Sequence, residues 1–273
     1  MGKAHRIKKI GEREMVVYEP KGKAREYSPL ALNVYLGCSH KCKYCYANRM
    51  AKMNGNENYF CVPEPRKCLM EKLHKELKNA PKQQVLLSFI GDPYCETTDD
   101  NRLTREALVA LEQAKSPVAV LTKGGTRCLK DLDVFKKFGE HIQVGATLTF
   151  SNAEDSAEWE SGAASPSDRI EALKVLHSAG VRTFASFEPV IDPAQSIKLI
   201  KDTIDFVDVY KVGKINNYKG IDKTIDWEGF LRQAVDILRA NGKRFYIKHD
   251  LRNSAPSVRL YGNECLSEEH NVM

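Results

Sequence analysis

Three cysteines that stand close together are the residues of this sequence best suited to chemistry. Cys38, Cys42 and Cys45 form a C-x3-C-x2-C pattern, whereas the other five of the eight cysteines are scattered along the chain. Thiolates are preferred ligands of zinc and of iron–sulfur clusters. Three thiolates in one short loop leave a four-coordinate site one ligand short, while a structural zinc normally takes a fourth protein ligand. The spacing therefore favours an iron–sulfur cluster of four irons with one iron open to a small molecule.

Zinc is the alternative, in a non-catalytic module whose three-cysteine loop is structural. His40 is the candidate for a fourth ligand, but it lies two residues from both Cys38 and Cys42, so the loop would be strained if all four side chains pointed inward. A disulfide scaffold is excluded because the cysteines are too sparse for a chain of this length.

Short β-branched runs alternate with longer amphipathic runs from Ala31 onward, about six times. This alternation predicts parallel strands joined by helices. We expect helices over residues 66–78, 104–114 and from 166 onward, a loop over 157–167, and strands over residues 33–36, 85–90, 118–122, 142–149, 182–187, 207–212 and 245–248. Ser165 and Pro166 mark the start of the third helix, because they provide a cap and a proline at the first helical position.

The predicted fold is α/β: a partial or near-closed (β/α)6 barrel, in which each right-handed crossover packs its helix on the same outer face. A flat doubly wound sheet is the competing architecture. Gly124 and Gly125 follow a strand but lack the third glycine of the dinucleotide-binding fingerprint, so a Rossmann-type nucleotide site has little support. Both architectures place chemistry at the carboxyl ends of strands, where Asp92, Lys123 and Glu188 stand.

The cysteine pattern, with the aromatic Tyr44 directly before the last cysteine, resembles that of the radical S-adenosylmethionine (radical SAM) superfamily. Four segments, residues 37–47, 91–94, 121–123 and 186–189, together resemble one branch of this superfamily. That branch is the spore photoproduct lyase-like one, often labelled DNA repair photolyase-like. The resemblance runs from about Asn33 to about Lys248, which is most of the chain.

The resemblance implies two cofactors and a reaction class. Cys38, Cys42 and Cys45 would hold a [4Fe–4S] cluster, whose open iron is chelated by the amino and carboxylate groups of S-adenosylmethionine. Reductive cleavage would give methionine and a 5′-deoxyadenosyl radical that abstracts hydrogen from a substrate, in lyase or oxidoreductase chemistry. An electron donor such as flavodoxin or ferredoxin is implied as a partner.

Residues at the other strand ends suit the parts of S-adenosylmethionine. Backbone carbonyls at Gly91 and Asp92 can receive the methionine ammonium, and Lys123 offers a point charge to the carboxylate. Thr147 and Thr149 alternate onto one face of a strand and can bond ribose hydroxyls. Each also has a structural interpretation: a plain turn, a surface lysine beside flexible glycines, and β-branched strand formers.

Three further residues are candidates whose roles stay open. Tyr44 can cover the adenine ring or simply shield the cluster. In spore photoproduct lyase a cysteine just before the motif at Gly91 returns a hydrogen atom to the product radical; the aligned position here is near Phe89, and Cys95 follows the motif instead. Cys95 is a relocated donor or a buried small hydrophobe, and Glu188 is a substrate contact or half of an ion pair.

The composition of the 273 residues, 42% apolar and 29% charged, excludes a disordered or coiled-coil chain. No run of about 18 apolar residues occurs, so we expect a cytoplasmic protein without membrane contact. We expect a basic extension over residues 1–30, a core barrel over 31–250 and a tail over 251–273. Residues 1–30 contribute +4, eight basic minus four acidic side chains, to the net charge of +6. That extension either binds a nucleic acid or is a solvated terminus.

Overall fold

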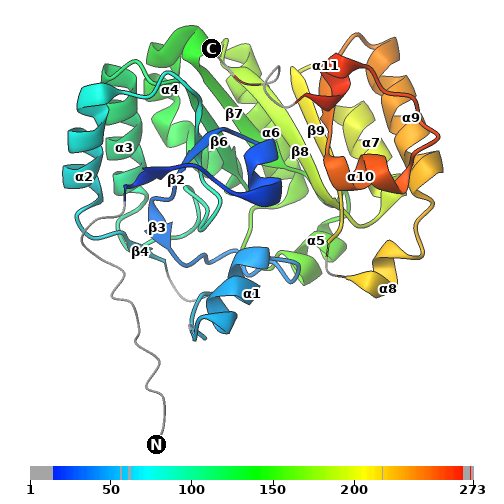
Figure 1. Ribbon diagram of the computed structural model, residues 1–273, viewed down its shortest axis with the longest axis horizontal. Helices are drawn as coiled ribbons and strands as arrows, with labels where there is room; N and C mark the ends of the chain where they lie inside the picture. The colour runs from blue at the N-terminus through cyan, green and yellow to red at the C-terminus, as the bar shows by residue number, and fades with distance from the viewer. Residues whose placement is uncertain (1–14, 56, 61–62, 217, 267–270, 272–273) are drawn as a thin grey trace, which may run out of the picture.

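The computed structural model of the chain describes residues 15–55, 57–60, 63–216, 218–266 and 271. Its centre is an eight-stranded sheet in the order β1-β2-β5-β6-β7-β8-β9-β10 (Figure 1). Seven strands run parallel: β2 (Leu30–Leu32), β5 (Val85–Leu87), β6 (Val118–Thr122), β7 (Ile142–Thr147), β8 (Arg182–Val190), β9 (Val209–Lys214) and β10 (Arg244–Ile247). Within the described residues no pairing joins β10 to β1, so the sheet is an open, partial barrel. The predicted α/β class is confirmed.

One edge of the sheet is a very short strand. β1 (Val17–Tyr18) pairs antiparallel with β2. The backbone N–H groups of Val16 and Val17 donate to the two carboxylate oxygens of Glu76, at 2.8 and 3.0 Å. A side chain of the helix α2 (Leu69–Glu76) therefore bonds to donors of the edge strand.

Helices cover the outer side of the sheet (Figure 1). After α2 they are α3 (Arg102–Gln113), α4 (Leu132–Phe138), α6 (Pro166–Ser178), α7 (Pro193–Thr203) and α9 (Trp227–Ala240). The other helices that follow α2 are α5 (Ala153–Trp159), α8 (Lys219–Asp222), α10 (His249–Ser254) and α11 (Gly262–Cys265). In α3 the buried side chains include Leu103, Ala107 and Leu111, which share one helix face. This spacing packs α2, α3 and α4 on one part of the sheet, while α7 and α9 pack on the other.

The inner face of the sheet is covered near β8 and β9 by the 3-10 segment η1 (Gly22–Glu26) and the residue after it. Tyr27 packs there against Phe184 and Val209, and its hydroxyl bonds to Ser186 at 2.6 Å. The chain before β2 is thus part of the interior of the half barrel.

Local signals located several elements correctly. β6 spans the predicted residues 118–122, and α6 begins where Ser165 accepts a bond from Asp168 N, with Pro166 as the first residue. The loop expected over 157–167 is wrong at its start, because α5 runs to Trp159. That helix is stabilised at its start because the Asn152 side chain accepts bonds from the backbone N–H groups of Glu154 and Asp155.

The first barrel strand was also predicted wrongly. Residues 33–36 do not extend the large sheet: β2 ends at Leu32, and β3 (Tyr35–Leu36) pairs antiparallel with β4 (Glu64–Pro65) in a separate two-stranded sheet. The chain leaves the large sheet at Asn33, whose side-chain oxygen accepts the backbone N–H groups of Phe89 and Ile90 at 3.0 and 2.9 Å. Among the described residues, no helix is long and apolar enough to cross a membrane.

Candidate functional site

The three-cysteine loop connects β3 to the helix α1 (Tyr46–Met53) and is fixed at both ends. Gly37 has φ +92°, and a Cβ there would lie 2.9 Å from the carbonyl oxygen of Tyr59, so glycine is required. Cys38 N donates to the same Tyr59 oxygen at 3.0 Å. Cys45 N donates to Cys42 O at 3.1 Å, immediately before α1 begins. The backbone thus gathers the three cysteines into one turn.

The three thiols are close enough to influence one another. Cys42 is buried, and Cys38 and Cys45 are half-buried. Burial raises the pKa of Cys42 to about 12, and the charges of the other two thiols contribute to this rise. A hydrogen bond with Cys95, together with burial, raises the pKa of the Cys38 thiol well above its usual range. Within the described part of the chain no three His, Cys, Asp or Glu side chains stand in metal-ligand geometry, and Cys38 instead contacts Cys95.

The chemistry of this donor set nevertheless fits a thiolate-ligated cluster. All three thiols come from one short loop, and Lys123 and Arg169 are cations that interact with Cys42 there. A cationic metal centre supplies the positive charge that stabilises buried thiolates. His40, the proposed fourth zinc ligand, is 1% exposed and faces Asp92 and Arg127, with its Nδ1 3.4 Å from the Asp92 carboxylate.

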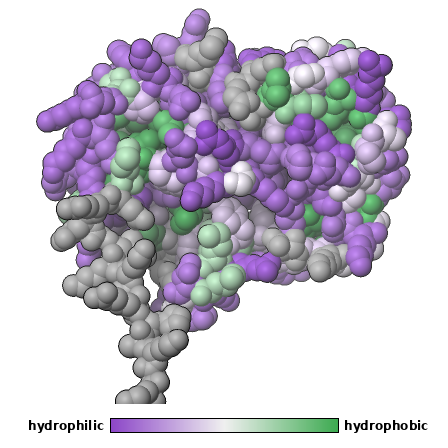
Figure 2. All heavy atoms as spheres, viewed as in Figure 1, coloured by the Kyte–Doolittle hydropathy of each residue, from purple (hydrophilic) through white to green (hydrophobic). Residues whose placement is uncertain are grey.

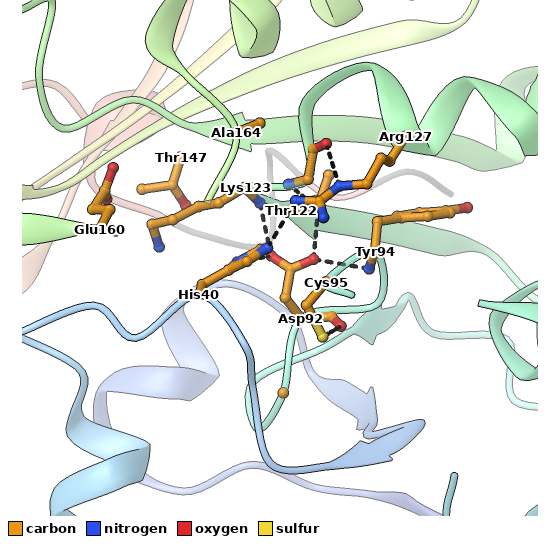
Figure 3. A network of polar contacts seen from close by, with 12 residues as sticks. His40, Asp92, Tyr94, Cys95, Thr122, Lys123, Arg127, Thr147, Glu160 and Ala164 are labelled. Carbon is orange, nitrogen blue, oxygen red and sulfur yellow. Dashed lines mark hydrogen bonds and ion pairs between the residues drawn. The ribbon is translucent and has the colours of Figure 1, made fainter. Parts of the chain in front are cut away.

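Asp92 joins the carboxyl ends of β5 and β6 (Figure 3). Its carboxylate accepts bonds from Thr122 Oγ1 at 2.6 Å, Lys123 N at 2.7 Å and Tyr94 N at 2.9 Å. Although burial alone would raise the pKa of Asp92, the His40 ring and these donors hold it well below its usual range. The side chain is an ionised anchor between two strand ends. The two backbone carbonyls predicted to receive the ammonium already accept hydrogen bonds, that of Gly91 from Ser88 Oγ and that of Asp92 from Cys95.

Lys123 extends from the end of β6 toward the cysteine loop. Its Nζ lies 5.5 Å from the centre of the Tyr44 ring. Burial lowers the pKa of Lys123, but the neighbouring Cys42 and Glu160 outweigh that effect and raise it. Lys123 is therefore a half-buried cation beside the thiols rather than a surface lysine.

A buried ion pair that the sequence interpretation missed holds Tyr44. Glu160 and Arg169 are each 1% exposed, and Arg169 Nη2 lies 2.6 Å from Glu160 Oε2. The Tyr44 hydroxyl donates to Glu160 and lies 3.2 Å from Thr149 Oγ1. Arg169 Nη1 also donates to the carbonyl of Thr147 at 3.0 Å. These contacts fix Tyr44 beside the end of β7.

One signal in the sequence could have revealed half of that pair. Arg169 lies four residues before Leu173 and seven before Leu176, so it occupies the buried stripe of α6 where an apolar residue is expected. A charge in that stripe needs a buried partner. Glu160 carries no comparable signal, because it stands in an irregular stretch between α5 and α6.

Cys95 and Glu188 lie in different surroundings. Cys95 is fully buried and its thiol donates a hydrogen bond to Asp92 O at 3.1 Å. It also forms a hydrogen bond with the free thiol of Cys38, so it packs against the cysteine loop. Glu188 Oε2 accepts from Lys248 Nζ and from the Tyr27 hydroxyl, each at 2.7 Å. Glu188 thus belongs to a network with the segment that covers the inner face of the sheet.

The structure therefore brings most of the predicted residues together at the carboxyl ends of β5, β6 and β7. Asp92, Lys123, Tyr44, Thr149 and Glu160 are linked to one another or to the thiols by the contacts above. Thr147 takes part through its carbonyl, while Glu188 is engaged elsewhere.

Several proteins are similar to this chain. The uncharacterized protein MJ0683 of Methanocaldococcus jannaschii is 33% identical over 185 residues, which are 66% of this chain and 67% of that protein. The uncharacterized protein Rv2578c of Mycobacterium tuberculosis is 25% identical over 167 residues, 59% of this chain and 49% of that protein.

Two solved structures share the fold. Streptococcus suis SuiB bound to S-adenosylmethionine matches with a TM-score of 0.57 at 16% identity, over 85% of this chain and 53% of SuiB. A spore photoproduct lyase mutant with bound AdoMet and dinucleoside spore photoproduct matches with a TM-score of 0.59 at 12% identity, over 92% of this chain and 66% of the lyase. The chain thus spans about half the length of SuiB.

A family model supplies the assignment. The model described as the radical SAM superfamily matches residues 32–207, which include the cysteine loop and the strands β3 to β8. Because it covers more than half of the chain, this match shows that the chain belongs to the radical SAM superfamily, whose enzymes use a [4Fe–4S] cluster and S-adenosylmethionine.

Proposed function

We propose that Cys38, Cys42 and Cys45 hold the [4Fe–4S] cluster of this radical SAM enzyme and that its substrate is a nucleic acid. The observation that carries the first half is that three thiols of one loop lie near enough to influence one another's pKa, beside the cation of Lys123. When bound and reduced, the cluster supplies the electron that cleaves S-adenosylmethionine to methionine and a hydrogen-abstracting 5′-deoxyadenosyl radical.

The surrounding residues support binding of S-adenosylmethionine beside that loop. Lys123 provides a positive charge for the methionine carboxylate, and Cys42 and Glu160 keep it protonated. The Asp92 anchor fixes the turn whose backbone would receive the ammonium. Burial and the Glu160 carboxylate raise the pKa of the Tyr44 phenol, which therefore stays neutral and offers its ring to adenine.

The two candidate catalytic residues, Cys95 and Glu188, both make structural contacts. The full burial of Cys95 against Asp92 and Cys38 favours a packing role over that of a hydrogen donor to substrate. Glu188 is paired with Lys248, which favours a structural ion pair. The donor of the final hydrogen atom is thus assigned to neither.

The nucleic-acid half of the proposal has separate support. The chain carries a net charge of +6, and eight of its basic residues lie in the first 30. Its fold matches that of spore photoproduct lyase, which was solved with a dinucleoside spore photoproduct. Cationic residues favour polyanions because each neutralised phosphate releases counterions.

Anaerobic reconstitution tests both halves. We expect a brown protein that forms 5′-deoxyadenosine from S-adenosylmethionine with dithionite, and faster turnover when single-stranded DNA or RNA is added. A colourless protein containing one zinc per chain would establish the non-catalytic alternative. Formation of 5′-deoxyadenosine that no oligonucleotide changes would refute the nucleic-acid half alone.

The cysteine assignment has a matched control within the chain. Cys38→Ala, Cys42→Ala and Cys45→Ala should each lose the cluster, because every corner needs a thiolate. Cys68→Ala and Cys265→Ala should retain it, since both cysteines lie away from the loop. Iron and sulfide per chain are the measurement, and equal losses in the two groups would overturn the assignment.

A further inference from the structure

The outer surface of the cysteine loop and α1 has an unusual charge balance. Residues 36–55 contain four basic side chains, Lys41, Lys43, Arg49 and Lys52, and no acidic one. All four are exposed. Lys43 is paired with the exposed Glu158 of α5, while the other three have no such partner among the described residues. This surface is therefore positively charged.

The same surface is apolar between its charges. Seven large hydrophobic side chains are exposed in the described residues, and four of them belong to residues 36–55: Leu36 at 57%, Tyr46 at 44%, Met50 at 51% and Met53 at 78%. Figure 2 shows pale green atoms at the position of α1, bordered by purple ones. Clustered exposed apolar side chains within a polar rim are typical of an interaction site.

The helix α1 buries few side chains against the rest of the molecule. Ala47 is the one buried residue among its eight, all of which the structure describes. Helices of this length are marginal in water unless an apolar face is packed. We name the exposed residues of this helix, Tyr46, Arg49, Met50, Lys52 and Met53, the α1 face.

The α1 face lies next to the thiols. Cys45 directly precedes the first residue of α1, and an eight-residue helix rises only about 12 Å. Lys123, Asp92 and the strand ends approach the same loop from the sheet. A partner on the α1 face would thus reach the cluster site from outside while the cofactor and substrate side stays free.

We propose that the α1 face is the docking surface for an acidic, low-potential electron-transfer protein of the flavodoxin class. This inference rests on the proposed cluster site. In each transfer the reduced carrier loses one electron and the docked chain gains one. A basic rim steers an acidic carrier and sets the encounter rate, and the methionines give the small apolar centre of a transient interface.

Nucleic acid is the competing occupant of a basic surface. Binding of single strands uses aromatic side chains interleaved with the charges, whereas two of the three exposed apolar residues of the α1 face are methionines. A flavodoxin surface therefore fits the α1 face better.

Charge reversal on the helix tests the proposal with the reconstituted holoenzyme. Arg49→Glu/Lys52→Glu should raise the Kd for oxidised flavodoxin about tenfold at low salt, since several weak ion pairs are replaced by repulsion. Flavodoxin-driven formation of 5′-deoxyadenosine should slow in parallel, while the dithionite-driven rate should stay at the wild-type value. Met53→Gln should raise the Kd without changing its salt dependence.

The matched control lies on α4, away from α1 in Figure 1. Lys136→Glu/Lys137→Glu reverses two exposed charges there and should leave the flavodoxin Kd unchanged. Equal Kd values for flavodoxin in both double variants and the wild type would overturn the proposal. So would a variant of α1 that loses affinity for a labelled single-stranded oligonucleotide but not for flavodoxin. Absence of dithionite-driven 5′-deoxyadenosine in the wild type would instead reject the proposed function.

Discussion

Lys123 is the residue whose environment departs most from what its sequence context indicates. Beside two glycines it could be an exposed lysine, yet it is half-buried next to Cys42, Glu160 and the Tyr44 ring. Its charge is maintained by neighbours, so its removal should affect ligand binding more than folding.

We expect Lys123→Ala to keep its iron and sulfide but to bind S-adenosylmethionine about ten- to a hundredfold more weakly, because a charge-assisted bond to the carboxylate is lost. Equilibrium dialysis with the reconstituted protein measures the change. Lys130→Ala, which removes an exposed lysine paired with Asp100, is the control. Unchanged affinity in Lys123→Ala would show that the cation does not contact the cofactor.

The Glu160–Arg169 pair gives a second prediction at this scale. Arg169→Met should lower the free energy of unfolding by about 3–5 kcal/mol, because it leaves a buried carboxylate with Lys123 as its remaining cation. Arg169→Met/Glu160→Gln should recover part of the loss. Urea unfolding of the protein measures both, with Lys198→Met as a control that breaks the exposed Lys198–Asp202 pair. An equal effect of Lys198→Met would contradict the assigned role of burial.

Lys211 provides a pH-dependent prediction. Burial, assisted by the charge of Lys248, lowers its pKa from 10.5 to about 7. Between these values the unfolded chain binds a proton that the folded chain does not, so Lys211 makes stability rise with pH from about 7 to 10.5. The unfolding free energy of the wild type, minus that of Lys211→Met, should therefore increase with pH across that window, by up to about 1.4 kcal/mol per pH unit. A difference that stays constant from pH 7 to 9.5 would show that Lys211 is protonated in the fold.

At the scale of elements, the ends of strands depend on contacts from distant segments. Asn33 accepts two backbone N–H groups from the stretch between β5 and the Gly91 turn. Asn33→Ala leaves those donors without their acceptor, which costs about 1–3 kcal/mol when they are buried. We expect a loss of stability in this range together with weaker binding of S-adenosylmethionine. Ser257→Ala, which removes an exposed bond to Glu228, is the control.

Elements defined by local signals could be predicted from the sequence. Ser165 and Pro166 start α6 through a cap and a fixed φ, both encoded within four residues. Contacts between segments could not be predicted in this way. Nothing near Cys38 indicates that Cys95 will pack against it, and nothing near Tyr44 indicates that Glu160 will accept a hydrogen bond from its hydroxyl. The wrongly predicted strand at residues 33–36 has the same cause. The chain leaves the large sheet at Asn33, whose side chain accepts hydrogen bonds from the backbone N–H groups of Phe89 and Ile90.

At the scale of the whole molecule, the N-terminal segment combines residues that belong to the fold with residues that carry a basic charge. Residues 15–27 contribute β1 and η1 to the sheet and its inner face, so a deletion that extends to residue 25 would disturb the fold. Residues 1–14 lie outside the described residues and carry five basic and two acidic side chains.

Deletion of residues 1–14 should flatten the salt dependence of single-stranded DNA binding, because fewer counterions are released. Fluorescence anisotropy at two salt concentrations gives the slope for the full chain and for the deletion. An identical slope would assign the nucleic-acid contacts to other residues, and no binding at low salt would remove nucleic acid as the substrate.

The carboxylate of Glu76 on the donors of Val16 and Val17 has a consequence for handling the protein at high concentration. An uncapped sheet edge is a template on which a second chain adds a strand and starts aggregation. Here the N–H group of Val17, in the two-residue edge strand, and that of Val16 directly before it are already bonded to a charged side chain. Edge-to-edge growth into fibrous precipitate is thereby blocked on this side, and Glu76→Ala should shorten the time over which concentrated samples stay free of light scattering.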